Sequence, residues 1–370
     1  MMYDNNIEDF GWYEVGNRRY YNKIHALYDH MENRVPIRWN VNDDIYAKYK
    51  WNQEPAQSLA ELYGERARYL RNRYDYLVLH FSGGSDSCNI LETFIDNKID
   101  LDEIVTRGSY SQSRLTTGVV AATEQYSECL TQALPLAQWA KDTHFPHVKI
   151  SVVDTSNIIL DYFRKNPNWA DFGGAGLTPG MCVKSNLDLI DPHWKSLADR
   201  GHKVAHIVGV DKPKIFRHNQ YFYTRWTDMD LGEFNSSRTT HDDYPQYIEC
   251  FYWGRNAVNL QIKQLHVLKN YIKANDIPDI MFDTTQGRIY ENFIASVIYN
   301  RTLPLVSEHL KDSGQSLIQA KDAWFSKDTH DAAYVNWYKG TEYIGTKLSS
   351  EWFQKNKIKS FYSKPYNLGT

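Results

Sequence analysis

The chain has 370 residues, 42% of them apolar, and a formal net charge of −3. This length allows two or three compact units, and the small charge gives no global electrostatic reason to expect a nucleic-acid partner, although a local basic patch stays open. No segment approaches the roughly 18 uninterrupted apolar residues of a membrane span, and the first residues lack a basic then apolar signal, so we expect a soluble, cytoplasmic protein without a membrane partner.

Residues 1–75 are expected to form a helical N-terminal extension that packs on the rest of the protein. Two runs in this segment have helical character, residues 18–31 and residues 55–72. Pro55 suits the first position of the second helix, because the amide hydrogen that proline lacks would be unpaired there in any case.

An apolar run at residues 76–81 leads directly into a polar, glycine-rich loop at residues 82–87, with the sequence SGGSDS. The run suits a strand buried on both faces, and residues 88–95 are typical of a helix. The two glycines permit backbone angles and a close approach that a β-carbon would prevent. The loop amides and the positive helix end would then face one point, where pyrophosphate could bind. The alternative is an ordinary glycine turn between strand and helix.

Strand-like and helix-like patterns alternate beyond this loop. Further strands are expected at residues 103–107, 148–153 and 203–208. Helices are expected at residues 121–141, 157–165 and about 185–200, with Ser156 capping the second of them. Repeated β-α units predict an α/β fold with a doubly wound, mainly parallel sheet. Ligands of such sheets bind at the carboxyl ends of the strands, near the point where the strand order reverses.

The loop lacks the Gly-Lys-Ser/Thr ending of a Walker loop and instead resembles the SGGxDS signature of the PP-loop family, the ATP pyrophosphatases also called adenine nucleotide alpha hydrolases. The resemblance implies a PP-loop ATP-binding α/β domain at residues 76–215. In that family the loop grips the β- and γ-phosphates of ATP, and attack at the α-phosphate transfers AMP to a substrate. The resemblance also places the fourth strand beside the first.

The same resemblance suggests roles for individual residues. Asp86 would help to hold Mg²⁺, which prefers oxygen ligands, and Asp211 could share it. Lys212 or Lys214 could neutralise the leaving pyrophosphate; the alternative is a polar loop of solvated lysines. We therefore expect Asp86, Asp211 and Lys212 to be catalytic. The expected nucleotide-binding residues are Ser82, Gly83, Gly84, Ser85, Asp86, Ser87, Thr106, Arg107 and Gly209.

The layout of residues 76–214 resembles the synthetase domain of asparagine synthetase, with Glu124 at the start of the long helix and the run 194–204 before a glycine. Two features depart from that family. Val210 stands where its catalytic glutamate is expected, and no cysteine precedes Cys88, whereas a class II glutaminase needs one at its mature N-terminus. The sequence therefore does not support internal glutamine hydrolysis or asparagine as the product.

The four cysteines lie far apart and form no Cys-x-x-Cys pair. This spacing argues against a zinc knuckle, an iron–sulfur cluster or a two-cysteine sulfur relay. PP-loop enzymes that thiolate RNA or DNA usually need paired cysteines, so that branch of the family is disfavoured.

Residues 216–370 are expected to form a mostly helical C-terminal region. Within residues 256–274, Lys263 and His266 belong to a polar stripe that faces either the nucleotide or, more commonly, water. The last ten residues, 361–370, either fold back over an anionic ligand or fray as a free end.

The expected function is an ATP-dependent ligase-type enzyme of the AMP-forming kind. It would adenylate a substrate carboxylate or amide oxygen with release of pyrophosphate, and an amine would then displace AMP. Its partners would be ATP, Mg²⁺ and an unidentified small-molecule or nucleotide substrate. Two alternatives stay open, a PP-loop enzyme that modifies a nucleobase, nucleotide or nucleic acid, and an ATP-binding protein without turnover.

Overall fold

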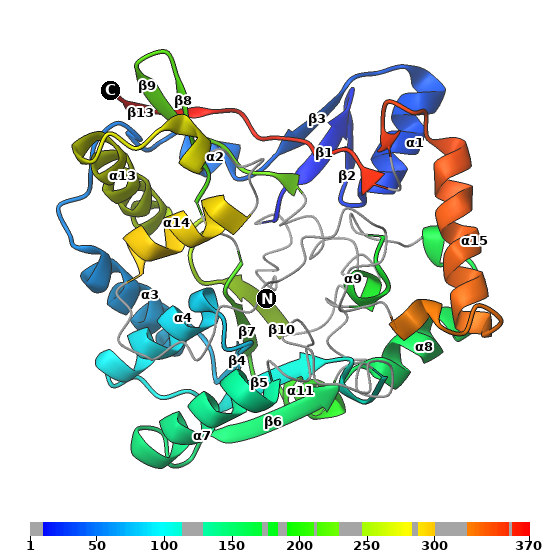
Figure 1. The fold of residues 1–370 in the computed structure, drawn as a ribbon, viewed down its shortest axis with the longest axis horizontal. Coiled ribbons are helices and arrows are strands. Elements are labelled where there is room, and N and C mark those ends of the chain that lie inside the picture. Colours follow the sequence, from blue (N-terminus) through cyan, green and yellow to red (C-terminus); the bar gives the residue numbers. More distant parts are fainter. Residues whose placement is uncertain are drawn as a thin grey trace.

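The computed structural model describes residues 10–112, 129–171, 177–183, 191–210, 213–228, 246–282, 288–299, 324–354 and 357–370. Its centre is an all-parallel five-stranded sheet with the strand order β10-β7-β4-β5-β6 (Figure 1). The strands are β4 (Tyr76–His80), β5 (Glu103–Gly108), β6 (Lys149–Asp154), β7 (Val204–Val208) and β10 (Gln246–Cys250). The predicted α/β class with a mainly parallel sheet is confirmed, in a Rossmann-like arrangement.

The strand order reverses beside β4. The chain runs outward from β4 to β5 and β6, then returns to β7 on the other side of β4, where Val78 pairs with His206. The fourth predicted strand therefore does lie beside the first. Right-handed crossovers place the helix after β4 on one face of the sheet and the helix before β7 on the other. On this second face, the Trp194 indole packs 4.6 Å from the His206 ring, centroid to centroid.

The helices described between residues 59 and 199 begin in different ways, some at a side-chain cap and some without one. They are α3 (Leu59–Arg73), α4 (Ser85–Asp96), α7 (Leu134–Thr143) after a short π-helix, η2 (Cys129–Ala133), then α8 (Ser156–Lys165), η3 (Trp169–Asp171), α9 (Pro179–Val183) and α11 (Pro192–Asp199). Helix α3 starts at a Ser58–Glu61 capping box rather than at Pro55. Residues 121–128 and 185–190, which we expected to be helical, lie outside the described residues.

The prediction that Ser156 caps α8 is wrong by one residue. Thr155 is the N-cap and makes no side-chain capping bond, while Ser156 is the first helical residue. The Asp154 carboxylate at the end of β6 accepts the Ser156 amide at 2.9 Å and the Ser111 amide at 3.0 Å. Burial opposes its charge, but hydrogen bonds from the side chains and then the amides of Ser111 and Ser156 outweigh that effect and lower the Asp154 pKa.

The N-terminal extension is not only helical. Strands β1 (Trp12–Val15), β2 (Arg18–Tyr20) and β3 (Ile37–Asn40) form an antiparallel sheet, and the predicted helix at 18–31 is divided between β2 and α1 (Lys23–Asn33). The Asn22 side chain accepts the amides of Ile24 and His25 and so starts α1 late. A short helix, α2 (Asp43–Tyr46), follows β3.

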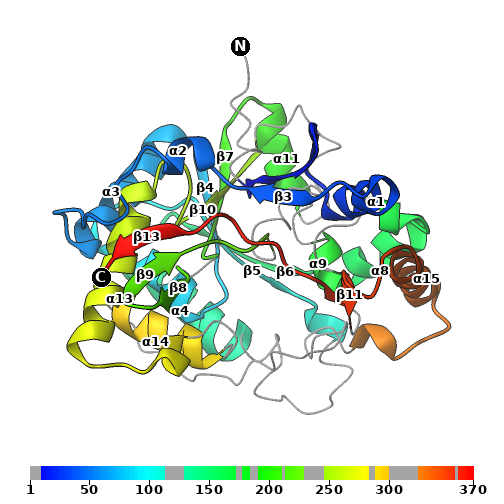
Figure 2. The same ribbon diagram turned by 90° about the horizontal axis from the view of Figure 1, so that it is seen from above.

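The C-terminal region combines helices with strands, one of which, β10, belongs to the central sheet. Its helices are α13 (Val258–Ala274), η4 (Asp279–Phe282), α14 (Arg288–Ile298) and α15 (Ala332–Lys347); its other strands are β8 (Ile215–His218), β9 (Tyr221–Thr224), β11 (Phe353–Gln354), β12 (Lys357–Ile358) and β13 (Tyr366–Gly369). β13 pairs with β9, which pairs with β8 (Figure 2). Leu368 is buried, so the tail does not fray as a free end.

A buried ion pair ties the two ends of the chain together. The ammonium of Lys23 on α1 lies 2.7 Å from the Asp228 carboxylate, and both side chains are fully buried. Tyr13 donates to the same carboxylate at 2.8 Å, and the Phe361 amide donates to its other oxygen at 2.8 Å.

Of the helices in the described ranges, none combines the length and apolar character needed to cross a membrane.

Candidate functional site

The loop that follows β4 has a backbone that only glycine suits. Gly83 adopts φ +76°, and a Cβ there would lie 2.6 Å from Gln132 Cγ and 3.0 Å from the Ala133 amide nitrogen. Gly84 is the N-cap of α4, and no side chain caps this helix. The loop therefore passes closely beneath the start of the helical segment 129–143 and presents the first turn of α4 at the carboxyl end of the sheet, as predicted from the sequence.

The loop serines shape the turn. Gly84 N–H donates to Ser82 Oγ at 3.3 Å, and Ser87 Oγ donates to the Gly84 carbonyl at 3.1 Å. The Ser82 and Ser87 hydroxyl oxygens lie 3.3 Å apart. Ser82 is exposed, Ser85 is half-buried and Ser87 is buried. The Ser82 and Ser87 hydroxyls thus lie together, beside the N-terminus of α4.

Gly209, which follows β7, touches the loop at Asp86. A Cβ on Gly209 would lie only 2.9 Å from Asp86 Cβ and 3.3 Å from the Asp86 carbonyl carbon. The structure therefore brings the loop 82–87 into contact with the segment that follows β7, at the point where the strand order reverses. This segment, which begins at Gly209 and was predicted to extend to Lys214, is called the second loop below. Asp211 and Lys212 lie outside the described residues. The Lys214 ammonium donates to Thr227 Oγ1 at 3.1 Å.

The half-buried Asp86 receives two phenol hydrogen bonds that the sequence did not reveal. Tyr299 donates to Asp86 Oδ1 at 2.6 Å, and Tyr252 donates to the Asp86 backbone carbonyl at 2.6 Å. The Asn89 amide in turn donates to the Tyr252 hydroxyl at 3.1 Å. Burial, followed by the nearby Asp86 charge, raises the pKa of both phenols well above the usual value. Both tyrosines therefore stay protonated and act as donors.

Thr106 and Arg107 lie near the end of β5 and point to opposite faces of the sheet, because successive side chains in a strand alternate. Thr106 is buried, and its hydroxyl lies 2.7 Å from the Tyr110 hydroxyl. Arg107 is half-buried. These two predicted nucleotide-binding residues therefore do not form one surface.

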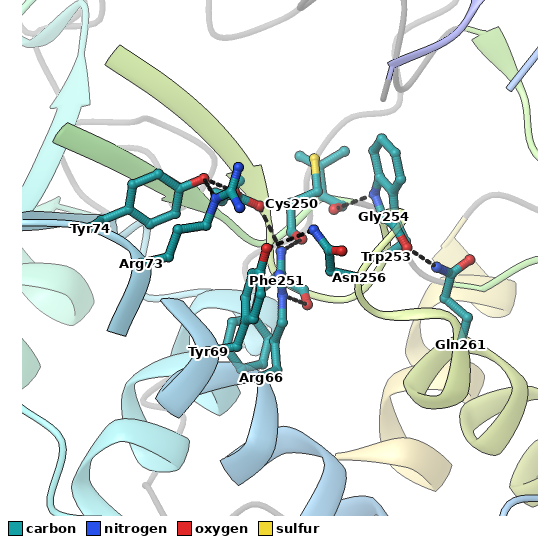
Figure 3. Close-up of polar contacts among 12 residues, drawn as sticks. Arg66, Tyr69, Arg73, Tyr74, Cys250, Phe251, Trp253, Gly254, Asn256 and Gln261 are labelled. Atoms are coloured by element: carbon teal, nitrogen blue, oxygen red, sulfur yellow. Dashed lines mark hydrogen bonds and ion pairs between the residues drawn. The ribbon is translucent and has the colours of Figure 1, made fainter. Parts of the chain in front are cut away.

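The segment after β10 is held by α3 (Figure 3). The Arg66 guanidinium makes a 2.8 Å ion pair with Glu249 and donates to the carbonyls of Cys250 at 2.9 Å and Phe251 at 3.2 Å. Figure 3 also shows Trp253, whose indole donates to the Val210 carbonyl at 2.8 Å. This buried arginine thus has a structural role, since it fixes the turn that aims Tyr252 and Trp253 at the two loops.

Lys263 and His266, in the polar stripe of α13, contact the N-terminal segment of the chain. Lys263 makes a 2.7 Å ion pair with Glu54. The buried His266 ring lies 2.9 Å from the Trp51 carbonyl, and burial lowers its pKa. Both residues pack against the N-terminal segment, so neither is a candidate for phosphate binding.

The donor set suits a magnesium ion better than a metal held by protein alone. Among the residues that the structure describes, no three His, Cys, Asp or Glu side chains are grouped to hold a metal. Mg²⁺ usually binds through one or two carboxylates together with substrate phosphates. Asp86 beside the first turn of α4 fits that pattern. All four cysteines are free thiols.

No protein-family model matches this chain, and no match to it was found among curated proteins. The resemblance to PP-loop proteins therefore stays a prediction from the sequence. A function has to be inferred from the two loops and the residues that hold them.

Proposed function

We propose that this protein is an ATP-dependent ligase-type enzyme that adenylates a substrate carboxylate or amide oxygen and lets an amine displace AMP. One observation carries the proposal: the loop 82–87 at the end of β4 touches Gly209 at the end of β7, where the strand order reverses. Ligands of open α/β sheets bind at this point. A glycine-rich turn that leads into a helix N-terminus also suits pyrophosphate.

Residues of both loops would bind the phosphates of ATP and the metal. The amides of residues 82–87, with the serine hydroxyls, would hold the outer phosphates of ATP. Asp86 would hold Mg²⁺, which when bound would offset the negative charge of the phosphates. Gly209 allows the second loop to approach Asp86 closely. Asp211 and Lys212, which lie outside the described residues, would complete the site. The resemblance to PP-loop proteins implies that the β- and γ-phosphates would leave together as pyrophosphate.

A nucleotide-binding protein without turnover is the second candidate. It is favoured by Val210, which stands where the resemblance to asparagine synthetase leads us to expect a catalytic glutamate. The Val210 carbonyl is engaged by Trp253, so its backbone is fixed as part of the second loop. Release of pyrophosphate separates an enzyme from such a binding protein.

The test is to incubate the protein with Mg·ATP and a metabolite extract, measure pyrophosphate, and identify adenylated or condensed products by mass spectrometry. The Asp86→Asn variant should fold normally but release no pyrophosphate, because a neutral amide cannot balance the charge of the metal. Asp96→Asn is the matched control, because Asp96 is exposed at the far end of the same helix. Equal activity of wild type and Asp86→Asn would refute the role of Asp86. Nucleotide binding without any pyrophosphate release would favour the second candidate.

A further inference from the structure

Asp86 is held by aromatic residues that are distant in the sequence. Tyr252 and Tyr299 follow it by 166 and 213 residues, and both donate to it at 2.6 Å. Their rings lie 5.3 Å apart, centroid to centroid, and both side chains are buried. The backbone carbonyl and the carboxylate of Asp86 are therefore fixed from the same side.

The second loop is held in the same manner. Trp253 donates to the Val210 carbonyl at 2.8 Å, and Tyr290 donates to the Pro213 carbonyl at 2.5 Å. Tyr290 belongs to α14, and Tyr299 directly follows that helix. The helix α14 with its following residue thus reaches both loops, one through each of two tyrosines.

We propose that Tyr299 is a positioning residue that sets the orientation of the Asp86 carboxylate toward the metal of a metal–nucleotide complex. This inference rests on the proposed function. It gives the residue that follows α14 a role in the site, although this residue lies outside the predicted nucleotide-binding domain. The bond to Oδ1 fixes rotation about the Cβ–Cγ bond, and so determines where Oδ2 lies. Residues that orient a metal-ligating carboxylate commonly change metal affinity by about 10- to 100-fold when they are lost.

Tyr299→Phe isolates this contact, because it removes the hydroxyl and keeps the buried ring. Tyr63→Phe is the matched control. Its hydroxyl is buried in the same tyrosine cluster, with its ring 5.9 Å from that of Tyr252, but donates to the Ile298 carbonyl at 3.2 Å instead of to Asp86. Tyr299→Phe loses the hydrogen bond to Asp86, whereas Tyr63→Phe loses the bond to the Ile298 carbonyl and the one that its hydroxyl accepts from the Gln264 amide. Both variants should therefore lower the temperature of thermal unfolding.

The measurement is the binding of Mn²⁺ to the full chain in the presence of α,β-methylene-ATP, by equilibrium dialysis. Free Mn²⁺ and its complex with free nucleotide reach the same concentration on both sides of the membrane, so the excess of Mn²⁺ on the protein side is the Mn²⁺ bound to the chain. Tyr299→Phe should weaken Mn²⁺ binding about tenfold or more, with the stoichiometry of the wild type. Tyr63→Phe should match the wild type. An unchanged stoichiometry shows that the weaker binding does not come from a misfolded fraction.

Equal Mn²⁺ affinity in Tyr299→Phe and wild type would overturn the positioning role and leave the proposed function intact. An equal loss in both variants would overturn it too, because the effect would then come from packing of the cluster. A wild-type chain that binds no Mn²⁺ with the nucleotide analogue would overturn the proposed function, and this inference with it.

Discussion

Gly209→Ala should push the two loops apart. The new Cβ would lie 2.9 Å from Asp86 Cβ, whereas carbon atoms make favourable contact at about 3.5 Å or more, so one loop must move by about 0.6 Å. The neighbouring atoms belong to the backbone and to the Cβ of Asp86, and a rotamer change cannot relieve them. Overpacking of this kind costs about 1–3 kcal/mol. If the strain is relieved only by displacement of one loop, nucleotide binding must return that loop to its place at the same cost in free energy. The affinity for the nucleotide should then fall by about 5- to 140-fold.

Calorimetric titration with α,β-methylene-ATP and Mg²⁺ measures the loss of affinity, and guanidinium unfolding measures the strain. The Ile90→Val change in the Gly209→Ala background serves as a control. It removes only the 3.4 Å contact with Ile90 Cδ1, so it should not restore binding. Wild-type affinity and stability in Gly209→Ala would refute the claim that the two loops meet at Asp86.

Three further predictions concern stability. Lys23→Met should cost about 3–5 kcal/mol in guanidinium unfolding, because it leaves the Asp228 charge buried without its partner; a loss below about 1 kcal/mol would contradict this. Leu368→Ala in β13 should cost about 2–5 kcal/mol and Asn367→Ala far less, and equal effects would mean that the tail does not pack as a strand. Hydrogen bonding from Arg164 lowers the pKa of Asp331, which is the N-cap of α15. The stability that this charge contributes should therefore be complete above the ordinary carboxyl pKa of about 3.9. It should be lost as the pH falls through the lowered pKa of the folded protein. Asp331→Asn keeps a capping side chain; its unfolding free energy should approach that of wild type at low pH, and a pH-independent difference would contradict the assignment.

The centre of the fold could be predicted because its signals are local. The apolar run before the glycines forms β4, and the two glycines lead into α4 at Ser85. The strands β5, β6 and β7 lie within about one residue of their predicted limits. Each of these elements is buried on the sheet, so hydrophobic pattern and turn chemistry point to the same answer.

The flanks could not be predicted as well, because their elements depend on partners far along the chain. β10 begins 38 residues after β7 ends, and its short sequence, Gln-Tyr-Ile-Glu-Cys, does not reveal that it extends the sheet. The polar stripe of α13 looked solvent-facing, but its Lys263 contacts Glu54 and its His266 contacts Trp51. Tertiary contacts of this kind override local patterns.

The candidate site divides in the same way. The loop 82–87 and Gly209 were predicted from residue types and the resemblance, and the structure brings them into contact. Tyr252 and Tyr299 were missed, because an aromatic residue in a long chain is most often a packing residue and no sequence pattern marks a phenol that donates to Asp86. Only the fold shows that the C-terminal region reaches the loop.

The most direct test of the account is to identify the bond of ATP that is cleaved. ATP labelled at the α-phosphate would be incubated with the protein, Mg²⁺ and a metabolite extract, and the labelled products separated. The account predicts labelled AMP or an adenylated substrate, together with pyrophosphate, because the loop 82–87 would hold the outer two phosphates as the leaving group. Stoichiometric formation of labelled ADP and inorganic phosphate would contradict it.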